Sequence, residues 1–83
     1  MSEQELIEAL AEKEHAGWAH WMRYLFSQCS EQGDGSMLIP PDKVARWKRQ
    51  METAYPDLTE REKQSDRNRV ALILPIIEAY KGN

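Results

Sequence analysis

Cysteine, long apolar runs and net charge are all scarce in this sequence of 83 residues. Cys29 is the only cysteine, so no disulfide can form within the chain, which indicates a reducing compartment. No stretch approaches the ~18 consecutive apolar residues that predict a membrane-spanning helix, and no basic-then-apolar leader opens the chain. We therefore expect a cytoplasmic protein that does not engage a membrane, with Cys29 as a small buried hydrophobic residue.

The charge balance narrows the range of partners. The formal net charge is −3 and the isoelectric point is near 5.3, whereas general nucleic-acid binding favours a basic surface. Nucleic acid is therefore not an expected partner. Charge is nevertheless uneven, because residues 1–14 hold five glutamates against one lysine and basic residues cluster at 43–49. The basic cluster has two interpretations, a solvated helix face or a patch for an anion or an acidic partner.

Motifs that carry chemistry are also missing. His15 and His20 are five residues apart, so a regular helix points them in different directions, and we predict no metal site. The loop at 30–36 lacks both the lysine of a phosphate-binding loop and the alternating acidic ligands of a calcium loop. No nucleophile and base are recognisable as a pair. We therefore predict a protein that is not an enzyme, has no catalytic residue and needs no cofactor.

Helix signals are the main structural content of the sequence. Apolar residues recur three to four positions apart, and turn residues separate the periodic stretches. We predict an all-α fold in one domain over 1–83, a small bundle of three main helices with a glycine-containing loop at 30–40. The predicted helices cover about 3–29, 41–54 and 60–80.

The starts of two of these helices are marked by capping boxes. Ser2 is followed three residues later by Glu5, and Thr59 is followed in the same way by Glu62. In such a box, the hydroxyl and the carboxylate each accept from the other residue's backbone amide. Inside the last helix, Pro75 removes a backbone hydrogen bond, so we expect a kink or a break there.

The first and last helices each have an apolar face, and we expect these faces to pack together as the core. Their main members are Ile7, Leu10, Trp18, Trp21, Leu25, Val70, Ile73, Leu74 and Ile77. Ionisable residues intrude on both faces: Glu14 and His15 on the first, and Lys63, Asp66 and Arg67 on the last. Because burial of an unpaired charge is costly, we expect Glu14 to form an ion pair with Lys63 or Arg67. Asp66 should then lie near His15.

This charged cluster has two interpretations. In the first it is architectural, and its ion pairs set the register of the helices without binding anything. In the second it lines a cleft in which a cationic side chain meets an anionic ligand. Trp18 or Tyr55 would then supply a stacking face.

Parts of both end helices resemble a known family. The residues that carry the likeness are Leu10-Ala11, His15 and Trp18, then Tyr55-Pro56-Asp57-Leu58-Thr59-Glu60, Glu62-Lys63 and Asp66-Arg67. This pattern resembles the RyR domain, the repeat first described in ryanodine receptors and also found in bacterial and phage proteins. The chain lacks the family's Gly-Trp-x-Tyr-Gly stretch after the first helix. The segments HWMRYLF (20–26) and RWKRQM (46–51) are also similar to small phage and prophage proteins.

The resemblance implies a mostly helical module. In ryanodine receptors such repeats take part in channel assembly and regulation, and one pair binds adenine nucleotide. Prokaryotic members have been proposed to sense nucleotide-derived signals in phage–host conflict. The likeness therefore raises nucleotide-like molecules above other ligands for this chain.

We predict a small binding module of the RyR-like type and of phage origin, with an anionic nucleotide-like ligand. The predicted ligand-binding residues are His15, Trp18, Tyr55, Lys63, Asp66 and Arg67, and Glu14 is predicted to form structural ion pairs. Arg67 and Lys63 would contact phosphate, the histidine and the aspartate would orient the ligand, and an aromatic ring would stack on it. The alternative is a protein-interaction or structural module, such as a homodimer that buries Trp21 or Trp47.

Overall fold

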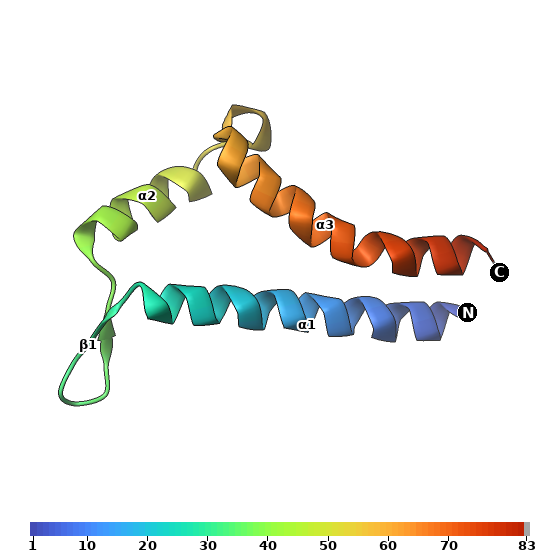
Figure 1. Cartoon of the computed structure of the whole chain (residues 1–83), viewed down its shortest axis with the longest axis horizontal. Coiled ribbons are helices and arrows are strands. Elements are labelled where there is room, and N and C mark those ends of the chain that lie inside the picture. The colour runs from blue at the N-terminus through green and yellow to red at the C-terminus, as the bar shows by residue number, and fades with distance from the viewer. Residues whose placement is uncertain (83) are drawn as a thin grey trace.

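The computed structural model describes residues 1–82 and confirms a small all-α chain with three main helices (Figure 1). The elements are α1 (Glu3–Ser27), β1 (Ser30–Glu31), β2 (Met37–Leu38), α2 (Pro41–Met51), the 3₁₀ turn η1 (Tyr55–Asp57) and α3 (Glu60–Lys81). The predicted helices begin at these positions, and the first two were predicted to end a few residues too late. No helix in residues 1–82 is both long enough and apolar enough to cross a membrane.

Both predicted capping boxes are present. Ser2 Oγ accepts from the Glu5 amide at 3.1 Å, and Glu5 Oε1 accepts from the Ser2 amide at 2.9 Å. At the start of α3, Thr59 Oγ1 accepts from the Glu62 amide at 3.2 Å, and Glu62 Oε1 accepts from the Thr59 amide at 3.1 Å. The bond from the Ser2 amide lowers the pKa of Glu5, because it favours the charged carboxylate. α1 and α3 therefore begin where side chains satisfy their free backbone amides.

The loop at 30–40 contains a small β-hairpin. β1 pairs antiparallel with β2, and Ser30 lies opposite Leu38. Gly35 takes a φ of 90° in the turn, a conformation that favours glycine. Asp34 accepts from the hydroxyl and the amide of Ser36, and these bonds lower the pKa of Asp34. The hairpin gives the connection between α1 and α2 a defined shape.

α3 runs unbroken through Pro75 and changes direction partway along its length (Figure 1). Of the two predicted outcomes, a kink or a break, the structure therefore shows the kink. One missing backbone hydrogen bond bends a helix without ending it when the residues on either side keep helical geometry.

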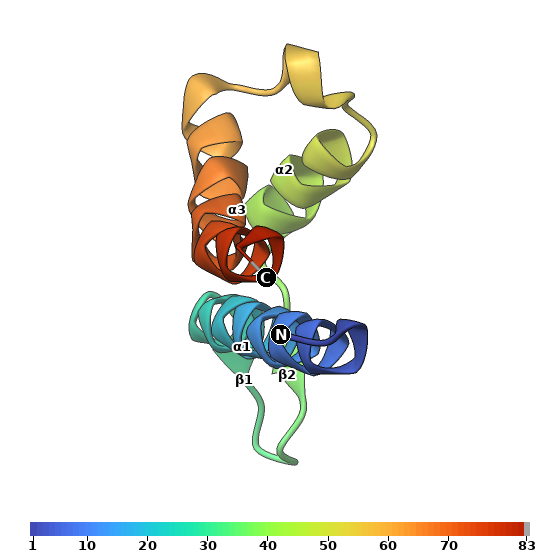
Figure 2. The ribbon, with the colours of Figure 1, turned by 90° about the vertical axis from the view of Figure 1, so that its right-hand side faces the viewer.

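The helices form a single layer. α1 and α3 lie side by side and antiparallel and make the main helix–helix contact, while α2 lies across one end of the molecule (Figures 1 and 2). The molecule measures 51 × 34 × 16 Å, so it is elongated and thin along one axis. The radius of gyration is 16.8 Å, whereas a compact chain of this length has about 12 Å.

This layered shape contradicts the predicted core. No hydrophobic side chain in residues 1–82 is buried, and Ile7, Trp18 and Leu74 are 52%, 58% and 47% exposed. The expected packing of the first helix against the last is present, but it covers only one side of each. Because a domain core normally needs two packed layers, the apolar faces of these helices stay largely open.

Candidate functional site

The predicted ligand-binding residues fall into separate groups. His15 and Trp18 stack on each other along α1, with ring centroids 5.9 Å apart and an interplanar angle of 27°. Tyr55, Lys63 and Arg67 gather where η1 meets the first turns of α3. These turns lie away from α1 in both ribbon views (Figures 1 and 2). The structure thus brings three of the six residues together and places the histidine–tryptophan pair on a different helix.

The η1–α3 cluster consists of Tyr55, Glu60, Lys63 and Arg67. Lys63 Nζ lies 5.9 Å from the centre of the Tyr55 ring, within the range of a cation–π contact. Arg67 Nη1 donates to Glu60 Oε1 at 2.7 Å. This bond raises the pKa of Arg67 and lowers the pKa of Glu60, because each charge favours the other. An anion that approaches Arg67 therefore has to compete with Glu60.

Glu14 forms an ion pair, but its partner is Arg69 and not Lys63 or Arg67. Arg69 Nη2 lies 3.2 Å from Glu14 Oε2. The predicted partners lie too early in α3, because its first turns diverge from α1 and Glu60 already holds Arg67. Both side chains of the observed pair are more than half exposed, so the pair adds little to stability.

Gly17 lets α3 approach α1 closely at the level of this ion pair. It is the one buried residue of α1, and a Cβ atom there would lie 2.8 Å from Arg69 Nη2. A hollow of about 190 Å³ beside Gly17 is bordered by Glu14, Arg69 and Asp66. Asp66 therefore faces α1 near Glu14.

Glu62 does more than its capping role predicts. Its side chain is 6% exposed, and it is the only buried charged residue among residues 1–82. It accepts from the Thr59 amide and from the guanidinium of Arg49 on α2. The bond from the Thr59 amide, helped by Arg49, lowers the pKa of Glu62 against the opposing effect of burial. One carboxylate thus caps α3 and joins it to α2.

An aromatic cluster joins α2 to α1. The rings of Trp21 and Trp47 meet edge-on, with centroids 5.5 Å apart and an interplanar angle of 68°. Tyr24 completes the group, with its centroid 5.4 Å from Trp21 and 6.4 Å from Trp47. Aromatic pairs of this kind add about 0.5–1.5 kcal/mol beyond the burial of their area. The sequence predicts that these rings lie on two different helices, but it does not predict that they are in contact.

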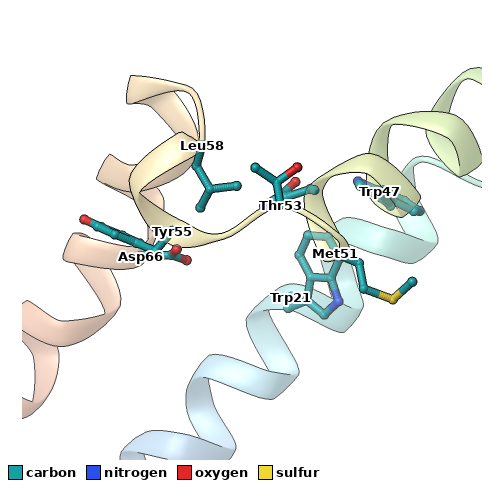
Figure 3. Close-up of a pocket in the computed structure, with 8 residues that line it drawn as sticks. Trp21, Trp47, Met51, Thr53, Tyr55, Leu58 and Asp66 are labelled. Atoms are coloured by element: carbon teal, nitrogen blue, oxygen red, sulfur yellow. The ribbon is translucent and has the colours of Figure 1, made fainter.

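An open groove of about 430 Å³ lies between the aromatic cluster and α3 (Figure 3). Its walls include Trp21 of α1, Trp47 and Met51 of α2, Tyr55 of η1 and Asp66 of α3. In Figure 3, Asp66 lies across the open space from Trp21, while the Tyr55 ring extends away from Trp21. Two of the predicted ligand-binding residues, Tyr55 and Asp66, therefore line this groove.

The groove suits a protein side chain better than a phosphate. Its single charged lining residue is Asp66, and a carboxylate repels a phosphate group. Tryptophan, tyrosine and methionine are the residue types that protein interfaces favour as anchors. The groove is thus chemically suited to an apolar or cationic group.

The metal-ligating and nucleophilic side chains of residues 1–82 form no further site. Within residues 1–82, no group of three or more histidine, cysteine, aspartate or glutamate side chains is placed to hold a metal ion. Cys29 is half-buried, and its thiol donates to the Leu25 carbonyl at 3.2 Å. Its position at the end of α1 is therefore explained by packing and one hydrogen bond.

A scan against models of known protein families, a search of curated proteins and a search of solved structures found no match for this chain. The similarity to the RyR domain stays a prediction from the residues that carry it. Function has to be inferred from the geometry of the helices, the groove and the η1–α3 cluster.

Proposed function

We propose that this chain is a protein-interaction module whose apolar surface is completed by another protein surface. One observation carries the proposal: no hydrophobic side chain in residues 1–82 is buried, and large ones are exposed on all three helices. Examples are Trp18 on α1, Met51 on α2 and Leu74 on α3. Monomeric proteins rarely leave extensive apolar surface open, and such surface marks interaction sites.

The groove in Figure 3 supports the same function. It is concave and rich in aromatic side chains, and the Trp21–Trp47 contact holds one of its walls in place. Concave aromatic surfaces accept the anchor side chains that dominate binding energy at interfaces. Asp66 adds one carboxylate that can pair with a basic residue of the partner.

The test is the accessibility of the three tryptophans to acrylamide. It is measured by fluorescence quenching on samples whose oligomeric state is known from their molecular mass. In dilute monomeric chain we expect strong quenching, because Trp18 and Trp21 are 58% and 41% exposed. On assembly with a partner surface, quenching should fall. A monomer whose tryptophans are all shielded would contradict the proposal, since the chain would then have a core of its own.

A second candidate function is the binding of an anionic, nucleotide-like ligand at the η1–α3 cluster, in the manner of an RyR-like module. It is supported by the position of Lys63 over the Tyr55 ring, beside Arg67. Two cations next to an aromatic ring match the phosphate and the base of a nucleotide. Glu60 opposes this function, because it already pairs with Arg67.

A thermal-shift panel of mono-, di- and cyclic nucleotides tests this second function. A ligand at 100 times its dissociation constant adds about 2.7 kcal/mol to stability, which raises the Tm of so small a domain by at least several degrees. Arg67→Ala should abolish the shift and Glu60→Gln should enlarge it, while Arg61→Ala is the matched control. A flat response of the unaltered chain to every nucleotide would end this candidate.

A further inference from the structure

The missing element of this fold is a second layer of helices. The shortest dimension of the molecule is 16 Å, against 51 Å for the longest. Stable domains pack two layers around a core, and residues 1–82 contain no buried hydrophobic side chain. Something outside the described chain therefore has to supply the opposite layer.

The amount of open surface gives the size of that layer. A compact monomer of 9.7 kDa exposes about 5,100 Å², whereas this chain exposes 6542 Å². The excess is roughly 1,400 Å² for each chain, so two chains that hid it from each other would bury roughly 2,800 Å² in all. That area lies within the range of obligate homodimers, about 2,000–5,000 Å².

The C-terminal half of α3 shows where this surface lies. Residues 70–77 read VALILPII, without one polar side chain. Only one side of α3 packs on α1, and Val70, Leu72 and Leu74 are 50%, 52% and 47% exposed. A helix that is apolar on all sides is normally enclosed by its neighbours. The α1–α3 pair therefore resembles half of a four-helix bundle.

The charge distribution favours one partner and one orientation. The first half of α1 carries Glu3, Glu5, Glu8, Glu12 and Glu14 against Lys13. At the other end of the long axis, α2 carries Lys43, Arg46, Lys48 and Arg49 against Asp42 (Figure 1). In a two-fold dimer every contact occurs twice. Antiparallel pairing sets the acidic end over the partner's basic end at both places, whereas parallel pairing opposes like charges.

From these observations we propose that the partner is a second copy of this chain. Two α1–α3 layers pack face to face in antiparallel orientation, and their exposed apolar side chains form a shared core. Principal contributors are Ile7 and Trp18 of α1 and Val70 and Leu74 of α3. This inference names the partner of the proposed interaction module and rests on that proposal.

The first experiment measures the mass of the full chain by light scattering and its Tm by circular dichroism at several concentrations. We expect twice the chain mass and a Tm that rises with concentration, because folding is then coupled to association. Leu74→Glu should abolish the doubled mass and lower the Tm. Asn68→Glu, an added charge on the charged half of the same helix, should leave the dimer intact.

The second experiment measures orientation through the single cysteine. A nitroxide on Cys29 of each copy reports the separation of the two α1 C-terminal ends by pulsed electron resonance. Antiparallel pairing predicts roughly 35 Å, about the length of α1 at 1.5 Å per residue. Parallel pairing predicts less than about 20 Å, because packed helices lie about 8–10 Å apart. The shorter distance would overturn the antiparallel dimer.

The outcomes separate this inference from the function on which it rests. A helical monomer at all concentrations with quenchable tryptophans overturns the dimer and leaves a module for a different protein. A monomer with shielded tryptophans overturns both the dimer and the proposed interaction module. If Leu74→Glu fails to fold, the Tm of the unaltered chain still tests the dimer. A Tm that does not change with concentration excludes folding coupled to association.

Discussion

The two ends of the molecule are stabilised in different ways. At the α2 end, Glu62 binds Arg49 and the rings of Trp21 and Trp47 meet, so directional contacts within the chain define the arrangement. At the other end, the last turns of α3 lie beside the first turns of α1 (Figure 1), and apolar side chains such as Leu74 stay exposed. The first end is held by directional contacts within the chain, whereas the second leaves apolar side chains exposed, and there we propose that a partner binds.

The largest effect at the α2 end should come from Trp47→Ala. This change removes both ring contacts between α2 and α1, and we expect a loss of about 2–3 kcal/mol in the free energy of unfolding. Chemical denaturation measures it. Met51→Ala is the control, because that side chain is 73% exposed and surface changes stay within about 0.5 kcal/mol. Equal losses in the two variants would show that the aromatic cluster is not what holds this end together.

Glu62→Gln should have the next largest effect and should depend on pH. A lowered folded-state pKa means that the carboxylate stabilises the fold above its ordinary value of 4.5 and stops doing so as the pH falls through the folded pKa. We therefore expect the variant to melt several degrees lower at pH 7, with the difference shrinking below pH 4.5. Thermal melts between pH 3 and 7 measure this, with the exposed Glu8→Gln as control. A difference that stayed constant with pH would mean that the ionised carboxylate is not responsible.

The two capping boxes offer a smaller, matched comparison. Thr59→Ala removes the cap of a helix whose first turn is held by a buried carboxylate, and we expect a loss of about 1 kcal/mol. Ser2→Ala removes the equivalent bond at the exposed start of α1, where the first turn can fray without disturbing the rest. The loss of stability in Ser2→Ala should stay below about 0.5 kcal/mol. A larger effect at Ser2 would show that the first turn of α1 is held more firmly than its exposed contacts indicate.

Gly17→Ala, at the junction of the two ends, should have the smallest effect. Alanine gains about 1 kcal/mol over glycine in a helix, but its Cβ displaces the flexible end of Arg69. The net change should lie within about 0.5 kcal/mol. In an Arg69→Ala background the same substitution should stabilise more. Destabilisation in both backgrounds would mean that more than the Arg69 side chain limits the approach of α3.

Local features of the fold were predictable from the sequence. The capping boxes at Ser2 and Thr59 define their helix starts because each needs only residues three positions apart. Turn residues separated the three helices, and the α1–α3 pairing followed from matching apolar faces. Pro75 predicted a kink or a break in α3, but a proline alone does not decide between the two, because the outcome depends on its neighbours.

Features that depend on how helices are inclined were not predictable. The ion pair of Glu14 with Arg69 needs the angle between α1 and α3, and the Arg49–Glu62 bond needs the path of the chain around η1. Apolar periodicity predicted that one face of α1 and one face of α3 are buried, yet members of both, such as Trp18 and Leu74, are exposed, because burial depends on what covers a face. A sequence pattern alone does not tell whether the apolar faces of the helices are covered by other parts of the same chain or by another protein.

The single layer of helices has a consequence for how stability varies with temperature. A typical globular chain gains about 12–15 cal/mol/K per residue in heat capacity on unfolding, because buried apolar surface becomes hydrated. A chain with no buried hydrophobic side chain has less such surface to expose than a compact one. Alone, it should show a flatter dependence of its unfolding free energy on temperature than a compact domain of the same length. Curvature that appears on assembly would therefore measure the apolar area that the second surface covers.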